Sequence, residues 1–74
     1  MVFLQFETKN EMTLVDAKSI VTISYSDLDE LTTITLTSGE KITGLRCFVA
    51  DLIKALKLAK IKNDFEVIEV KYNL

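Results

Sequence analysis

The chain has 74 residues, a formal net charge of −2 and an apolar content of 49%. This length allows one domain, so residues 1–74 are treated as a single unit. The chain contains no histidine and one cysteine, Cys47, which excludes an internal disulfide and the common zinc ligand sets. Apolar side chains must therefore hold the domain together, within the chain or shared with another subunit.

Charge and the first residues bear on where the protein acts. A net charge of −2 gives no overall attraction to nucleic acid or to an anionic membrane. The opening MVFLQFE has no basic segment, and no run approaches the roughly 18 apolar residues of a membrane span. Together with the unpaired thiol, these features predict a cytoplasmic protein with no membrane partner.

Strand patterns occupy the first half of the chain. Apolar residues alternate with period two from Val2 to Glu7, and residues 20–25, IVTISY, are rich in β-branched and aromatic types. Residues 8–11 are typical of a turn between the first two strands. The strands expected in this half are residues 2–7, 12–15, 20–25 and 31–37.

The stretch TTITLTSGEKITG predicts a tight β-hairpin. A three-residue loop at 38–40, with Gly39 at the position of positive φ, pairs Leu36 with Ile42. Ile34 is then opposite the second glycine of the stretch. In this register the three aliphatic residues face the core, and Thr35, Thr37, Lys41 and Thr43 face solvent.

The second glycine, Gly44, is expected to mark a bulge or a close packing contact. It does not belong to a phosphate loop, which needs a Lys-Ser/Thr pair after its second glycine, because Leu45 and Arg46 follow here. Without histidine the usual general base and catalytic triad are also missing. The sequence therefore predicts a protein that is not an enzyme and holds no cofactor or metal.

Beyond Leu45 the apolar spacing changes to the helical period and predicts an amphipathic helix at 48–60. Residues 65–72 predict a final strand, whose phase shift at 67–68 indicates a bulge or burial on both faces. The predicted class is α+β, a small antiparallel sheet of about five or six short strands with the helix packed on one face. The apolar stripe of the helix comprises Phe48, Val49, Leu52, Ile53, Ala55, Leu56 and Ala59.

Basic residues are concentrated around this helix. Residues 46–62 carry five basic residues against Asp51 alone, whereas residues 1–45 carry seven acidic residues and three lysines. They predict either a surface for phosphates or an acidic partner, or a solvated helix face. The residues assigned to the candidate surface are Arg46, Lys54, Lys57 and Lys60.

Cys47 follows a predicted strand and precedes the predicted helix. A helix N-terminus can lower the pKa of a thiol and make it reactive. An isolated cysteine is more often a small buried apolar residue, which is the interpretation preferred here.

Two family resemblances rest on the runs AKSIVTISY, TTITLTSGEKI and FVADLIKAL. The chain resembles small flagellar FlbD-type proteins in Ile20, Ile23, residues 33–37, Gly39 and Ile42. It also resembles the strand-hairpin-helix part of LytTR-type DNA-binding domains, although their Arg-Ser-containing C-terminal segment has no counterpart in residues 64–74. The first resemblance implies a small cytoplasmic regulatory or assembly factor.

Three functional hypotheses follow. The first is a small non-enzymatic regulator or adaptor that binds another protein or a second copy of itself, with the first or last strand as a free edge. The second is a LytTR-like nucleic-acid-binding regulator that uses the lysine-rich helix. The third is a phage- or plasmid-like inhibitor of a host protein.

Overall fold

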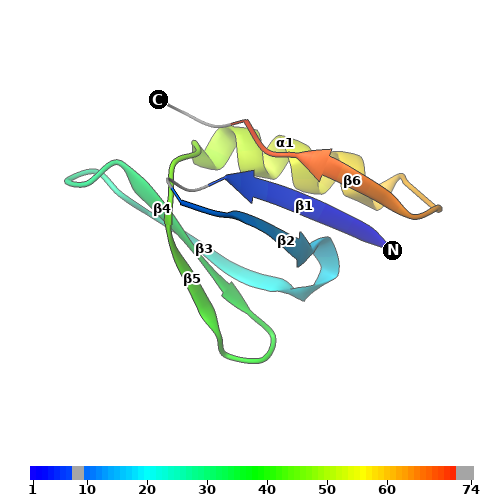
Figure 1. The fold of residues 1–74 in the computed structure, drawn as a ribbon, viewed down its shortest axis with the longest axis horizontal. Coiled ribbons are helices and arrows are strands. Elements are labelled where there is room, and N and C mark those ends of the chain that lie inside the picture. The colour runs from blue at the N-terminus through cyan, green and yellow to red at the C-terminus, as the bar shows by residue number, and fades with distance from the viewer. Residues whose placement is uncertain (8–9, 72–74) are drawn as a thin grey trace.

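The computed structural model describes residues 1–7 and 10–71, which form six strands, an α-helix and a 3₁₀-helix (Figure 1). The prediction of an α+β domain is confirmed. The predicted turn at 8–11 and final strand at 65–72 include Thr8, Lys9 and Tyr72, which lie outside the described residues. The elements are β1 (Val2–Glu7), β2 (Met12–Asp16), η1 (Ala17–Ser19), β3 (Ile20–Ser26), β4 (Leu31–Leu36), β5 (Lys41–Leu45), α1 (Val49–Lys60) and β6 (Glu66–Glu69).

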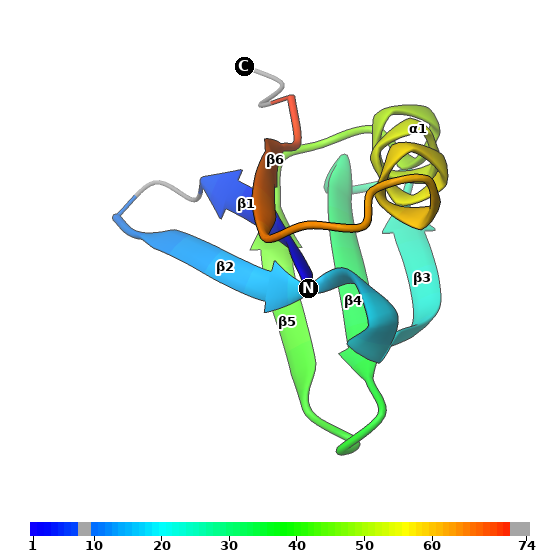
Figure 2. The ribbon, with the colours of Figure 1, turned by 90° about the vertical axis from the view of Figure 1, so that its right-hand side faces the viewer.

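The strands form two three-stranded sheets. In the described parts of the chain the first sheet has the order β2-β1-β6 and the second has the order β3-β4-β5. Figure 2 shows α1 end-on, beside β6 and above β3, so the helix closes the angle between the two sheets. β1 pairs antiparallel with β2 and parallel with β6. The expectation that the first strand is a free edge is therefore wrong, whereas the last strand, β6, is an edge.

The β4–β5 hairpin has the predicted loop length but a shifted register. Its loop comprises residues 37–39, because the N–H of Leu36 donates to the carbonyl of Glu40 at 2.8 Å. Ile34 consequently pairs with Ile42, so the predicted pairing is wrong by two residues. A shift of two preserves which side chains share a face. The predicted division into a core face and a solvent face therefore survives the error.

Both glycines of the hairpin have positive φ, 91° at Gly39 and 74° at Gly44. Gly39 ends the three-residue loop, where the left-handed conformation is expected. Thr32 pairs with Leu45 after a register shift, so two residues of β5 oppose one of β4 and the predicted bulge at Gly44 is confirmed. A Cβ at Gly44 would meet no atom within 4 Å. Backbone conformation, and not a packing contact, therefore explains this glycine.

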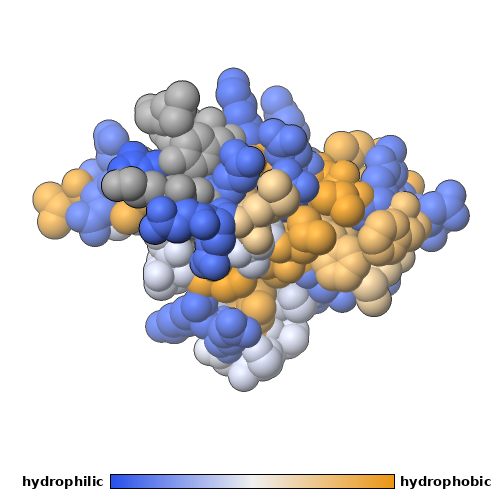
Figure 3. Space-filling view, in the orientation of Figure 1, coloured by the Kyte–Doolittle hydropathy of each residue, from blue (hydrophilic) through white to orange (hydrophobic). Residues whose placement is uncertain are grey.

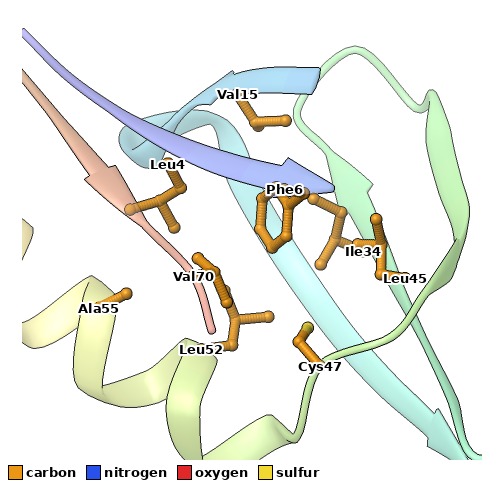
Figure 4. Close-up of a cluster of buried hydrophobic side chains, with 9 residues drawn as sticks. All are labelled: Leu4, Phe6, Val15, Ile34, Leu45, Cys47, Leu52, Ala55 and Val70. Atoms are coloured by element: carbon orange, nitrogen blue, oxygen red, sulfur yellow. The ribbon is translucent and has the colours of Figure 1, made fainter. Parts of the chain in front are cut away.

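The core lies between β1, the β4–β5 hairpin and α1 (Figure 4). The helix contributes Leu52 and Ala55, which lie to one side of the predicted apolar stripe. Phe48 and Ile53, which were expected in that stripe, are exposed. The helix therefore faces the core along a narrower line than its apolar spacing suggests. The buried cluster comprises Leu4, Phe6, Val15, Ile34, Leu45, Cys47, Leu52, Ala55 and Val70.

The position of β6 in the sheet accounts for the irregular apolar pattern of the last strand. β6 pairs with β1 without a register shift, so the bulge predicted at 67–68 is wrong. Ile68 packs against the core, and Val70 is buried just beyond the strand. Phe65 and Val67, from the other phase, are exposed. The apolar residues of this segment thus point to both faces but are buried on one only, so the alternative prediction of burial on both faces is also wrong.

Candidate binding surfaces

The four residues of the predicted basic surface are all exposed, but they do not form one site. Lys54, Lys57 and Lys60 lie on α1, whereas Arg46 lies in the connection between β5 and α1. Arg46 borders a shallow depression beside Phe6. Among residues 1–7 and 10–71, no ion pair joins any of the four to a carboxylate. The structure therefore places the three lysines on one helix and leaves Arg46 apart.

One surface groove, the β6 groove, lies between α1 and β6 and encloses about 590 Å³. Lys54, Leu58 and Ile61 line its helix side, and Ile68 and Glu69 line its strand side. Leu58 and Ile61 are exposed. An apolar floor beside the unpaired edge of a strand is a suitable surface for an extended segment of another protein.

A second groove, the β3 groove, lies on the other flank of α1 and encloses about 750 Å³. Ile53, Leu56 and Lys60 line its helix side. Ala17 of η1 and Ile20 of β3 line the opposite wall. Ala17, Ile20 and Leu56 also pack against the buried cluster, so the floor of this groove is continuous with the core.

The three helical lysines are divided between these grooves. Lys54 lines the β6 groove, Lys60 lines the β3 groove and Lys57 lines both. The three-residue spacing that predicted a single stripe is shorter than one helical turn of 3.6 residues, so successive lysines move around the helix. The lysines consequently form two groove rims rather than one linear stripe.

The outer face of the β2-β1-β6 sheet is an apolar surface that the sequence analysis did not identify. Phe3 of β1 pairs with Val67 of β6, and Gln5 pairs with Leu14 of β2, so these residues share that face. The rings of Phe3 and Phe65 are 5.8 Å apart and inclined by 59°, an aromatic pair of ordinary geometry. In Figure 3 apolar side chains gather over the region where Figure 1 draws β1, β2 and the start of β6. The available signal was the presence of apolar residues in both phases of the first and last strands.

Cys47 is a core residue, as the preferred interpretation predicted. Its side chain is buried, and its carbonyl accepts a 2.6 Å hydrogen bond from Oγ1 of Thr32. Burial raises the pKa of the Cys47 thiol; a hydrogen bond with Thr32 opposes this, and the negative charge of Asp51 adds to it. A raised pKa favours the protonated thiol, which together with burial supports the interpretation of Cys47 as a core residue.

Residues 1–7 and 10–71 contain neither a metal-binding cluster nor a membrane-spanning helix. There, no group of three or more His, Cys, Asp or Glu side chains is placed to hold a metal ion. The same residues include no helix with the length and apolarity needed to span a bilayer.

The geometry defines a small α+β domain with two grooves beside its helix and an exposed apolar sheet face. Comparisons of the chain with models of known families, with curated proteins and with solved structures gave no match. The resemblances to FlbD-type proteins and LytTR-type domains therefore remain hypotheses.

Proposed function

We propose that this chain is a small non-enzymatic regulatory or adaptor protein of the cytoplasm that binds another protein along the free edge of β6. The observation that carries the proposal is the position of that edge between two exposed apolar surfaces. Leu58 and Ile61 lie on its helix side in the β6 groove, and Phe65 and Val67 lie on the outer face of the sheet. Strand addition at such an edge takes affinity from backbone hydrogen bonds and specificity from alternate side chains.

The hydrogen bonds of β6 identify the backbone groups that are free to pair. The N–H of Glu66 donates to the carbonyl of Met1 at 3.2 Å, and that of Val70 donates to the carbonyl of Gln5 at 2.9 Å. In a parallel ladder the backbone N–H and C=O groups of these alternate residues point toward β1. The N–H and C=O groups of Val67 and Glu69 therefore point outward. A strand added there would alternate its side chains between the β6 groove and the outer face.

The edges of the second sheet are poorer templates. β3 has a register shift at Val21, and β5 has the bulge at Gly44. Bulges twist an edge away from regular pairing and are a common protection against strand addition. β6 pairs with β1 without such an irregularity, which favours it over β3 and β5. β2, the other edge of its sheet, is equally regular but lines neither groove.

The charges of β6 favour a different protein over a second copy of this chain. An antiparallel pair of β6 strands sets outward-facing residues opposite one another, so Glu69 of one copy would lie opposite Val67 or Glu69 of the other and would meet no basic residue. Like charges at directly opposed positions destabilise a pair of strands. A partner segment with apolar residues at alternate positions and a basic residue opposite Glu69 fits this edge better.

The variant Val67→Pro tests the proposal, because it removes an outward-facing N–H, keeps an apolar side chain at that position and leaves the bonds to β1 in place. Val21→Lys, at an exposed residue of the β3 edge, is the matched control. Wild-type and variant proteins are immobilised, and proteins retained from an extract of the native host are compared by quantitative mass spectrometry. Loss of a retained protein with Val67→Pro but not with Val21→Lys is expected. Retention of the same proteins by folded Val67→Pro, checked by circular dichroism, contradicts the proposal.

Nucleic-acid binding is a second candidate function, and it is favoured by exposed lysines that form no ion pair with a carboxylate of the described residues. If Lys54, Lys57 and Lys60 each contact one phosphate of duplex DNA, the logarithm of the binding constant falls with log salt with a slope of about −2.7. Replacement of all three by Glu is expected to abolish this binding. A slope near zero, or unchanged affinity of the triple variant, excludes this function for the helix.

A further inference from the structure

We propose that the β3 groove binds a single-chain anionic amphiphile, an alkyl chain that ends in a carboxylate or phosphate head. The groove encloses about 750 Å³, within the range of 300–1,000 Å³ that is usual for small-molecule sites. This site goes beyond the proposed protein-binding function and lies on the opposite flank of α1.

The floor of the groove supplies the surface for the alkyl chain. Ile53 and Leu56 come from α1, Ala17 from η1, Ile20 from β3 and Val2 from the start of β1. Ala17, Ile20 and Leu56 pack against the core, and Val2 is itself buried. A floor held by the core needs little rearrangement to receive a chain, and each methylene that is buried tightens binding by about fourfold.

The rim of the groove supplies the charge that selects an anion. Lys18, Lys57, Lys60 and Lys62 line it, and no carboxylate side chain does so among the described residues. Lys62 is paired with Glu66 at 3.4 Å. No ion pair within 4.0 Å joins the other three to a described residue. These ammonium groups can neutralise an anionic head at one end of an apolar chain.

The polar groups of the lining favour this ligand over a peptide or a nucleic acid. Lysines only donate hydrogen bonds, and Asn63 is the one described lining residue whose side chain can also accept them. A peptide backbone would bring N–H groups that need acceptors, whereas a carboxylate or phosphate only accepts. Single-stranded nucleic acids are usually held by aromatic stacking as well as charge, and no described aromatic ring lines this groove.

The two flanks of α1 provide matched variants. Ile53 and Leu58 are 42% and 41% exposed, but Ile53 lines the β3 groove and Leu58 lines the β6 groove. Lys60 and Lys54 form a second pair, one in each groove. Ile53→Gln and Lys60→Glu therefore perturb the proposed site, and Leu58→Gln and Lys54→Glu are their controls. All four side chains are exposed, so the substitutions should leave the core intact. A urea midpoint close to that of wild type confirms that each variant is folded.

Binding of dodecanoate and dodecyl phosphate to the full chain is measured by calorimetry below the concentration at which each forms micelles. Saturable 1:1 binding is expected. Ile53→Gln and Lys60→Glu should weaken it at least tenfold, and the control variants should change it less than twofold. Dodecyltrimethylammonium, with the same chain and a cationic head, should bind at least tenfold more weakly. The tighter of the two anions identifies the natural head group as carboxylate or phosphate.

Three results overturn the proposal. The first is equal binding of the cationic amphiphile, which would indicate an unselective apolar surface. The second is equal weakening by the site and control variants, which would indicate binding outside this groove. The third is tighter binding of an acidic amphipathic peptide or of phosphatidylglycerol vesicles than of either monomer, which would assign the groove to a protein or to a membrane surface. None of these results affects the test of the β6 edge with Val67→Pro.

Discussion

The hydrogen bond from Thr32 to the carbonyl of Cys47 makes the sharpest prediction of stability. Thr32 is fully buried, and its Oγ1 lies 2.6 Å from that carbonyl oxygen. The bond joins the central strand of the second sheet to the connection that leads into α1. Thr32→Val keeps the shape of the side chain and removes only the donor, so it isolates this contact.

The magnitude follows from two opposing effects. A buried acceptor left without its donor costs about 1–3 kcal/mol. The additional methyl group of valine, buried at the same position, returns about 0.8 kcal/mol. Thr32→Val should therefore lower the free energy of unfolding by about 0.2–2.2 kcal/mol. With a urea m-value of about 1 kcal/mol/M for a domain of this size, the midpoint should fall by about 0.2–2.2 M.

Urea unfolding followed by far-UV circular dichroism measures this change. Thr22→Val, at an exposed position of β3, is the control and should stay within about 0.5 kcal/mol of wild type. Thr32→Ser keeps the hydroxyl and loses the methyl, so it separates the hydrogen bond from packing. A Thr32→Val midpoint equal to or above that of Thr22→Val, at an unchanged m-value, would refute the reasoning.

Three other changes test the fold by urea unfolding. Gly44→Ala should cost about 1–2 kcal/mol through its positive φ alone, since open space surrounds its Cβ position; a loss above about 3 kcal/mol would reveal a hidden contact. Leu52→Ala, at a fully buried position, should cost about 2–5 kcal/mol, whereas Leu58→Ala should cost below about 1 kcal/mol; similar losses would contradict the orientation of α1. Because the pKa of Cys47 is raised in the folded state, its contribution to stability is fully present below the unfolded pKa of roughly 8.5 and is lost as the pH rises above that value. The urea midpoint should therefore fall from pH 7 to pH 9.5 more steeply in wild type than in Cys47→Ala. Equal slopes would refute this.

Local patterns were sufficient for the secondary structure. The alternation from Val2 to Glu7 and the helical spacing after Leu45 gave β1 and α1 with boundaries correct to a residue or two. Gly39 marked the hairpin loop correctly, but several three-residue loops fit the same sequence. In the structure the hydrogen bond from Leu36 to Glu40 places the loop at 37–39 and not at 38–40, and the bulge at Gly44 accompanies this register. Such a bulge changes the register by one residue and leaves little mark in the apolar pattern.

The candidate surfaces were harder to predict from the sequence than the secondary structure. Each lysine was identified correctly as exposed, because a charged side chain opposite an apolar stripe is solvated wherever the helix packs. Which groove each lysine lines depends on the rotation of α1 against the sheets, and that rotation left Ile53 exposed. The apolar outer face containing Phe3 and Phe65 was missed. Its two rings are 62 positions apart in the chain, since they come from residues 3 and 65, and no local spacing relates them.

The sequence by itself determined the α+β class, the order of the elements, the buried state of Cys47 and the need for glycine at 39 and 44, because backbone propensity and apolar periodicity act over a few neighbouring residues. Only the tertiary structure decided that the strands divide into two sheets, that the first strand lies between the second and the last, and that α1 has a groove on each side. These features arise from burying apolar faces against segments distant in the chain, and many arrangements of the same elements bury similar area. The way in which distant segments pack together sets the register of β6 on β1, the rotation of α1 and the free edge that carries the proposed function.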